Sequence, residues 1–217
     1  MTSLPSLCVF CGARLGHNAS YQAAAIEVGH LIAARGWRLV YGAGDVGLMR
    51  RAMALVQSVS TYPVCEIETP ADALRVPPRC LPVLQVVPVA PVLPWGCIDA
   101  RAGQLAGETV LWATRAALRG DVAALVTAPL HKEALHAAGA PYNQYPGHTE
   151  LLQAEAARHA GVTLAQMPVR MMLANDELRT VLVSIHMSLR DAIAAVTFDN
   201  VLQTLQITHA ALLRSLG

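Results

Sequence analysis

The sequence is poor in charged and aromatic side chains. Of its 217 residues only 14% are Asp, Glu, Lys or Arg and 5% are aromatic, whereas 54% are hydrophobic. The net charge is +1 and no run of Lys or Arg occurs, so the basic surface that nucleic-acid binding requires is missing and no nucleic acid is expected. A chain this apolar is expected to bury part of its surface against a partner chain.

Long uninterrupted apolar segments are also lacking. The most apolar stretch, residues 81–95, contains four prolines, whereas a membrane-spanning helix needs about 20 apolar residues in succession. The first residues lack the basic region and apolar core of a signal peptide. The five cysteines are odd in number and irregular in spacing, which together with the missing signal peptide predicts reduced thiols and a cytoplasmic location. The interrupted apolar stretch predicts no membrane partner.

What the sequence has is a regular succession of short apolar runs and helical patterns. The order strand, helix, strand, helix at the beginning is typical of a parallel sheet with covering helices. We therefore expect an α/β fold: a mostly parallel sheet with helices on both faces, in a Rossmann-like three-layer architecture. Strands are predicted at 7–11, 38–41, 123–127, 169–173 and 178–185, short strands and connectors at 63–95, and helices at 20–35, 46–56, 99–119, 131–139, 149–159 and 199–216.

Two polar segments between residues 127 and 150 are candidates for binding a ligand. Pro-Gly-His-Thr-Glu places His148 and Thr149 where a loop enters a helix, and the unpaired N–H groups of a helix start favour an anion. The simpler alternative is that Thr149 only caps the helix and His148 is a solvated loop residue. Lys132 follows Thr-Ala-Pro at the start of the preceding helix. It could contact a phosphate or be an exposed first-turn side chain.

A third candidate is His186, which is expected just past the end of a buried strand. In open α/β sheets ligands bind at the carboxyl ends of the strands, and imidazole is the commonest metal ligand. A zinc-type centre needs at least three protein ligands, so His186 alone does not make a site. An ordinary core or loop histidine is the alternative.

Several motifs together resemble the 4-hydroxythreonine-4-phosphate dehydrogenase family. The resemblance covers about residues 40–217, with the motifs in order and at near-normal spacing. They are Val-Tyr-Gly (40–42), Asp-Val-Gly-Leu-Met-Arg-Arg-Ala-Met (45–53), Ile-Asp-Ala-Arg-Ala-Gly-Gln (98–104), Thr-Ala-Pro-Leu-His-Lys-Glu (127–133), Pro-Gly-His-Thr-Glu-Leu (146–151) and Ile-His-Met-Ser-Leu-Arg-Asp (185–191).

The resemblance implies an enzyme of pyridoxal-phosphate biosynthesis that oxidises 4-phosphohydroxy-L-threonine, or a related hydroxy acid, with NAD and a divalent metal (zinc, magnesium or cobalt). It implies that His148 and Thr149 bind the small phosphorylated substrate and that His186 is one metal ligand. From its position we expect Lys132 to be a further substrate-binding residue. It also implies a homodimer with the active site shared across the interface.

The sequence departs from this family in three places. The family's two further metal-binding histidines, in Asn-Pro-His-Ala-Gly-Glu and His-Asp-Gln-Gly motifs, do not occur, and neither do the later NAD-binding region and the glycine-rich opening segment. His209 is expected in the middle of a helix and is no replacement. We therefore expect a fold that is incomplete relative to the full dehydrogenase, with weakly held cofactors and doubtful turnover by this chain alone.

The first part of the chain resembles a second family, the LOG-type (lysine-decarboxylase-like) cytokinin-riboside-monophosphate phosphoribohydrolases. The residues concerned are Cys-Val-Phe-Cys-Gly-Ala-Arg (8–14) and Gly-Trp-Arg-Leu-Val-Tyr-Gly-Ala-Gly (36–44). That family's catalytic Pro-Gly-Gly-x-Gly-Thr-x-x-Glu stretch does not occur. The organisation expected is a LOG-like β-α-β segment at 1–49 overlapping a dehydrogenase-like metal- and substrate-binding region at 40–217. The alternatives to a dehydrogenase are a LOG-type phosphoribohydrolase relative and a non-catalytic remnant that binds phosphorylated small molecules.

Overall fold

The computed structural model divides the chain into two compact units, Met1–Gly161 and Val162–Gly217. The structure describes residues 6–9, 38–41, 46–55, 63–88, 93, 96–127, 130–175 and 177–216. The helix predicted at 20–35 lies outside these residues. The division after Gly161 was not anticipated from the sequence.

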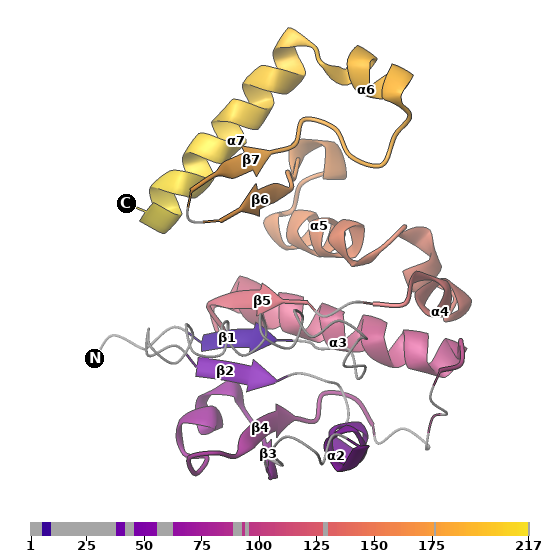
Figure 1. Ribbon diagram of the computed structural model, residues 1–217, viewed down its shortest axis with the longest axis vertical. Helices are drawn as coiled ribbons and strands as arrows, with labels where there is room; N and C mark the ends of the chain where they lie inside the picture. The colour runs from indigo at the N-terminus through magenta and orange to yellow at the C-terminus, as the bar shows by residue number, and fades with distance from the viewer. Residues whose placement is uncertain are drawn as a thin grey trace. The chain divides into compact units, whose positions relative to one another are not determined.

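A five-stranded parallel sheet forms the centre of the first unit, and β1, β2 and β5 lie side by side in Figure 1. The strand order is β3-β4-β2-β1-β5, and every pairing is parallel. This confirms the predicted sheet. The strands are β1 (Ser6–Val9), β2 (Arg38–Tyr41), β3 (Val64–Ile67), β4 (Leu81–Leu84) and β5 (Ala124–Val126).

The helices of this unit begin and end close to the predicted positions. They are α2 (Val46–Leu55), α3 (Ala100–Arg119), α4 (Lys132–Ala137) and α5 (His148–Ala160), with short 3-10 turns η1 (Pro70–Leu74) and η2 (Tyr142–Gln144).

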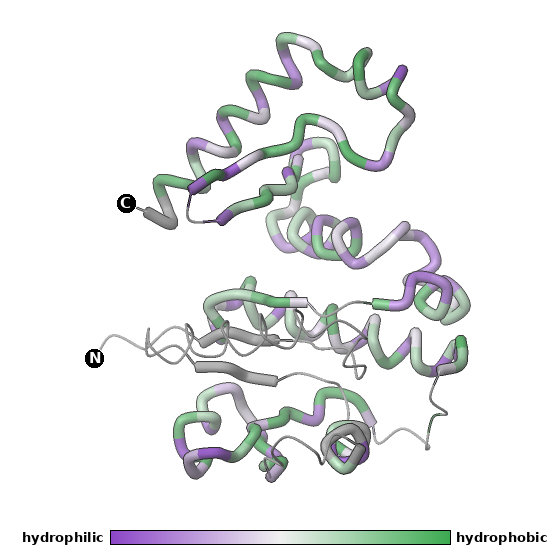
Figure 2. Tube along the Cα trace, viewed as in Figure 1, coloured by the Kyte–Doolittle hydropathy of each residue, from purple (hydrophilic) through white to green (hydrophobic). Residues whose placement is uncertain are grey.

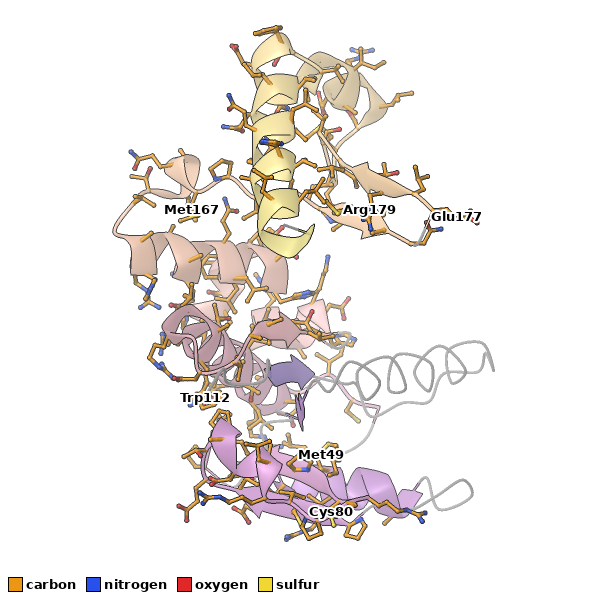
Figure 3. All side chains as sticks on the ribbon, turned by 90° about the vertical axis from the view of Figure 1, so that its left-hand side faces the viewer. Met49, Cys80, Trp112, Met167, Glu177 and Arg179 are labelled. Atoms are coloured by element: carbon orange, nitrogen blue, oxygen red, sulfur yellow. The ribbon has the colours of Figure 1, made fainter. Side chains whose placement is uncertain are left out.

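Helices cover both faces of the sheet, as predicted. Val83 of β4 packs against Val46 and Met49 of α2, whereas Leu84, the next residue, lies in a cluster with Trp112 of α3. Successive side chains of a strand point to opposite faces, so α2 and α3 lie on opposite faces. Figure 3 labels Met49 and Trp112 on these helices.

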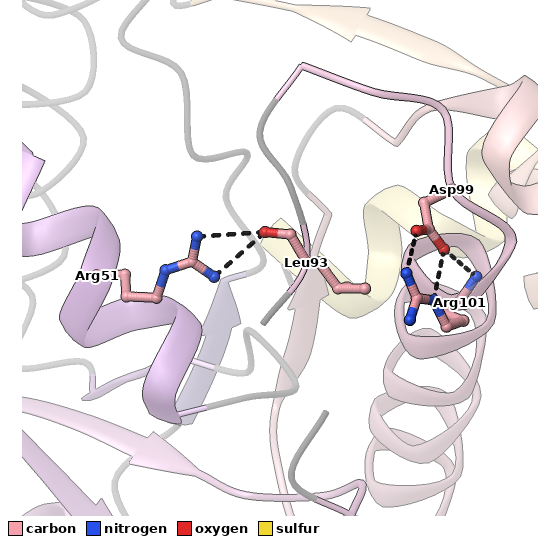
Figure 4. Close-up of polar contacts among 4 residues, drawn as sticks. All are labelled: Arg51, Leu93, Asp99 and Arg101. Atoms are coloured by element: carbon pink, nitrogen blue, oxygen red, sulfur yellow. Dashed lines mark hydrogen bonds and ion pairs between the residues drawn. The ribbon is translucent and has the colours of Figure 1, made fainter. Parts of the chain in front are cut away.

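Both ends of α3 follow from local sequence. Asp99 is the N-cap and accepts a hydrogen bond from the backbone N–H of Arg101 at 2.8 Å, as Asp at this position commonly does. Hydrogen bonds from the Arg101 side chain and backbone lower the pKa of Asp99 to about 2 (Figure 4). The helix ends at Gly120, whose φ of 83° suits glycine.

A second polar contact joins α2 to the segment before α3. The guanidinium group of Arg51 donates to the carbonyl oxygen of Leu93 at 3.2 and 3.3 Å (Figure 4).

Close packing between α3 and the segment that follows β5 builds the core under the candidate site. A Cβ atom on Gly103 would lie 1.8 Å from the carbonyl oxygen of Ala134, so the backbones of α3 and α4 touch there. A Cβ atom on Gly107 would lie 2.5 Å from the ring of Tyr142. The buried side chains of this core are Val110, Leu135, Tyr142 and Leu151. They hold α3, α4, η2 and α5 together.

In its described residues, the second unit contains a two-stranded antiparallel sheet, two helices and one short turn. Its elements are η3 (Leu164–Gln166), β6 (Met172–Ala174), β7 (Arg179–Val181), α6 (Leu189–Ala195) and α7 (Phe198–Leu216). Arg170 joins the start of the hairpin to α7 by donating to Thr204 at 2.8 Å and to Asn200 at 2.8 Å. Glu177 lies at the hairpin turn beside Arg179 (Figure 3). The predicted pairing of these strands is confirmed, but the strands are shorter than expected.

Apolar side chains lie exposed on α6 and α7, where green apolar residues alternate with purple polar ones along the chain in Figure 2. Leu189 and Phe198 are 79% and 81% exposed, and Ile193 and Leu205 are also exposed. This is the kind of uncovered apolar surface that the composition predicts. None of the helices, as far as their residues are described, is long and apolar enough to cross a membrane.

Candidate functional site

Three predicted site residues and one further threonine meet at the start of α5. Thr127 comes directly after β5, at the carboxyl end of that parallel strand. Lys132 begins α4 and His148 begins α5. The site thus lies at a strand end, where open α/β sheets bind their ligands.

A hydrogen bond links the strand end to the helix start. The hydroxyl oxygen of Thr127 and Nε2 of His148 are 3.1 Å apart, and both residues are half-buried. His148 is therefore part of α5 and held by a tertiary contact. The alternative of a solvated loop histidine is wrong.

Lys132 reaches the same helix start. A Cβ atom on the buried Gly147 would lie 3.6 Å from Cε and 4.0 Å from Nζ of Lys132, so the ammonium group lies close to the first turn of α5. The Glu150 carboxylate is on this side as well, with Oε2 3.4 Å from the same Cβ position. None of the ion pairs found among the described residues involves Lys132.

Within the described part of the chain, no side chain caps the first turn of α5, which leaves its N–H groups available to a ligand. Its N-cap is Gly147, which has no side chain to accept a hydrogen bond, so no side-chain cap is formed. Thr149 lies inside the helix and is half-buried. The alternative that Thr149 caps α5 is therefore wrong. The helix dipole, these N–H groups and the Lys132 charge all favour an anion.

Two residues that support the site, Thr127 and His131, were not predicted from the sequence as site residues. Thr127 was noted only as part of a motif, although its polar side chain directly after an apolar strand was the available signal. His131 is the N-cap of α4, and its Nδ1 accepts a hydrogen bond from the backbone N–H of Ala134 at 3.3 Å. His131 therefore helps to begin the helix that carries Lys132.

A buried carboxylate fixes α5 to α3 away from the site. Glu155 is 6% exposed. Its Oε1 accepts a hydrogen bond from Arg115 at 2.9 Å and also forms an ion pair with Arg158. Burial raises the pKa of Glu155, but the hydrogen bonds from the two arginines outweigh burial and lower this pKa below its usual value. A side chain paired in this way is structural.

His186 does not lie where it was predicted. The strand before it, β7, ends at Val181, is mostly exposed and belongs to the antiparallel hairpin. The expectation that His186 directly follows a buried strand is therefore wrong. The rule that ligands bind at the carboxyl ends of parallel strands does not apply to His186, because β7 is part of an antiparallel pair. His186 is exposed in the loop before α6, with a φ of 54°. It belongs to the second unit, so its convergence with His148 and Lys132 stays a prediction.

The described residues do not complete a zinc-type metal centre. Within the described part of the chain, no three His, Cys, Asp or Glu side chains lie together. A zinc-type centre needs at least that many protein ligands. The role of His186 as one metal ligand stays a prediction.

The fold and the site define an α/β protein with a candidate anion-binding site at a strand end. The sequence matches the family model described as "Pyridoxal phosphate biosynthetic protein PdxA" over residues 37–217. The chain belongs to this family. The family model begins at residue 37, but a 4-hydroxythreonine-4-phosphate dehydrogenase of Caulobacter vibrioides is 34% identical over 194 residues, 88% of this chain, so similarity to this family extends into the segment for which a LOG-like origin was expected.

Known relatives carry two related names. A 4-hydroxythreonine-4-phosphate dehydrogenase of Beijerinckia indica is 45% identical over 123 residues, which is 56% of this chain and 33% of that protein. A D-threonate 4-phosphate dehydrogenase of Pectobacterium atrosepticum is 36% identical over 171 residues, 79% of this chain and 49% of that protein. The chain thus spans between a third and a half of the length of these relatives.

A crystal structure of a 4-hydroxythreonine-4-phosphate dehydrogenase from Burkholderia phymatum has a similar fold. Its TM-score is 0.68 at 28% sequence identity, and the match covers 98% of this chain and 59% of that chain.

Proposed function

We propose that this chain carries the substrate-binding part of a dehydrogenase that oxidises a hydroxyl group of a small phosphorylated hydroxy acid. The substrates to test first are 4-phosphohydroxy-L-threonine and D-threonate 4-phosphate, because relatives are named for both. The observation that supports this proposal most directly is the grouping of Lys132, His148 and Thr149 at the uncapped first turn of α5.

The roles proposed for these side chains follow from their chemistry. The first-turn N–H groups of α5 and the Lys132 ammonium bind an anionic group of the substrate, because both favour negative charge. His148 and Thr149 contribute polar hydrogens at the same turn and orient the ligand. Glu150 carries the opposite charge next to Gly147. This carboxylate is suited to a cationic or hydroxyl group of the substrate.

NAD, a divalent metal and the homodimer enter this proposal from the family resemblance. The described residues provide no complete metal site, so we assign no step of the reaction to a metal. A non-catalytic protein that binds phosphorylated small molecules is the second candidate, since the site favours an anion whether or not turnover follows. A LOG-type phosphoribohydrolase is the remaining alternative, and most of the residues that carry this resemblance lie outside the described part.

Calorimetric titration with 4-phosphohydroxy-L-threonine tests the site. The variant His148→Ala should weaken binding roughly 10- to 100-fold, because a hydrogen bond to a charged group contributes about 1.5–3 kcal/mol. The matched control is His159→Ala, which removes an exposed histidine in the last turn of the same helix, and it should bind as the unmodified chain does. Equal affinity of the two variants would remove the role proposed for His148.

Turnover separates the first candidate from the second. Reduction of NAD by the full chain with the same substrate and added zinc, magnesium or cobalt would support the dehydrogenase. Binding without any NAD reduction would leave the non-catalytic candidate.

A further inference from the structure

The contact between Thr127 and His148 determines which hydrogen the imidazole can offer. Only one nitrogen of a neutral imidazole carries a hydrogen, whereas a threonine hydroxyl can donate or accept. If the hydroxyl donates to Nε2, the ring hydrogen is on Nδ1. If Nε2 donates to the hydroxyl, Nδ1 carries a bare lone pair. The tautomer of His148 is thus coupled to Thr127 through the 3.1 Å contact.

An anion-binding site distinguishes between these two arrangements. The groups proposed to bind the anion, the first-turn N–H groups and the Lys132 ammonium, are donors, whereas the Glu150 carboxylate is assigned to another part of the substrate. A bare lone pair on Nδ1 would face an oxygen of the anion and repel it, whereas Nδ1–H would donate to it. Donation from Thr127 to Nε2 is therefore the arrangement that fits an anionic ligand.

We propose that Thr127 is a positioning residue for His148. Its hydroxyl donates to Nε2, holds the imidazole in the Nδ1–H tautomer and leaves Nδ1–H as the ring donor for the substrate. This inference rests on the proposed function, because it takes the ligand to be an anion bound at the start of α5.

Thr127 is well placed for this role. It directly follows β5, whose last residue, Val126, pairs with Val9 in the parallel sheet. The hydroxyl is therefore fixed by the sheet, while His148 is fixed by α5. A hydrogen bond between two separately supported elements restrains the ring more strongly than one between neighbours on a flexible loop.

The test uses the full chain with nitrogen-15-labelled histidine. Long-range proton–nitrogen spectra distinguish a protonated from an unprotonated ring nitrogen, and His148→Ala assigns the signals. We expect an unprotonated Nε2 in the unmodified protein. Thr127→Val, which keeps the shape and removes the hydroxyl, should change this pattern. Thr127→Ser should restore it.

Titration with 4-phosphohydroxy-L-threonine provides the second readout. Thr127→Val should weaken binding about three- to tenfold, the range expected for one neutral hydrogen bond, and Thr127→Ser should stay within about twofold. Adding Thr127→Val to His148→Ala should weaken binding no further, since Thr127 acts through the imidazole.

The outcomes separate the two proposals. A protonated Nε2 in the unmodified protein, or a Thr127→Val protein with unchanged His148 signals and affinity, overturns the positioning role even where His148→Ala weakens binding. If His148→Ala leaves the affinity unchanged, the proposed substrate site itself fails. The tautomer in the unmodified protein decides the first question even if Thr127→Val does not fold.

Discussion

Replacing Gly103 by alanine introduces a methyl group at the point where α3 touches α4. The added Cβ would lie 1.8 Å from the carbonyl oxygen and 2.3 Å from the carbonyl carbon of Ala134. Both atoms belong to the backbone of a buried residue, so no side-chain rotation can relieve the overlap. The helix α4 must move away from α3, and this movement disturbs the packing of the fully buried Leu135.

The expected cost follows from two opposing effects. Overpacking of a well-packed core costs about 1–3 kcal/mol and occasionally more, and a backbone overlap of this size belongs at the upper end. In a helix interior, alanine is more stabilising than glycine by about 0.5–1 kcal/mol, which offsets part of this cost. The net loss is about 2–3 kcal/mol, which lowers the thermal midpoint by roughly 4–12 °C for a chain of this size.

Thermal unfolding followed by circular dichroism measures this change, and Gly47→Ala is the control. Gly47 is an exposed residue of α2, so alanine there should leave the midpoint unchanged or raise it slightly. Gly103→Ala should also weaken binding of the phosphorylated substrate, because α4 carries Lys132. A Gly103→Ala protein as stable as the unmodified chain would refute the close α3–α4 packing.

Three further predictions concern charged side chains. Lys132→Ala should weaken binding of 4-phosphohydroxy-L-threonine about tenfold in calorimetry, because the ammonium group forms a charge-assisted interaction with the ligand. The thermal midpoint should stay unchanged, because this exposed side chain is not part of the core. Glu155→Gln should cost about 1–2 kcal/mol in urea unfolding at pH 7. Folding lowers the pKa of Glu155. The stability that the ionised carboxylate contributes is therefore fully present above its unfolded pKa of about 4.3 and is lost as the pH falls through the folded pKa. The free energies of unfolding of the two proteins should converge in acid. Arg170→Met should destabilise the second unit by about 1–3 kcal/mol in hydrogen exchange, because hydrogen bonds to α7 are lost; protection equal to that of the unmodified chain would contradict this.

Local signals predicted the elements that position the site. Asp99 and Gly120 set the two ends of α3 through capping preferences that act within a few residues. The start of α5 was predicted within one residue of His148. The apolar run that ends at Thr127 predicted β5. These features are readable because the interactions that cause them are close in sequence.

Other features depend on contacts between distant residues and could not be read in this way. The bond from Thr127 to His148 joins residues on different elements, and no spacing rule predicts it. The apolar residues before His186 suggested one long buried strand. Among the described residues the strand is Arg179–Val181, and it pairs with another short strand in a largely exposed hairpin. Whether an apolar run is buried in a sheet or exposed on a hairpin is decided by its tertiary neighbours.

The proposed function depends on binding of the substrate's anionic group at the first turn of α5. Proton–nitrogen spectra of the full chain, recorded during a titration with 4-phosphohydroxy-L-threonine, test it at individual residues. We expect saturable shifts of the backbone amide signals of Gly147, His148 and Thr149, with a midpoint at about tenfold higher ligand concentration in Lys132→Ala. Saturable shifts confined to other parts of the chain, or a midpoint at these amides that Lys132→Ala leaves unchanged, would contradict it.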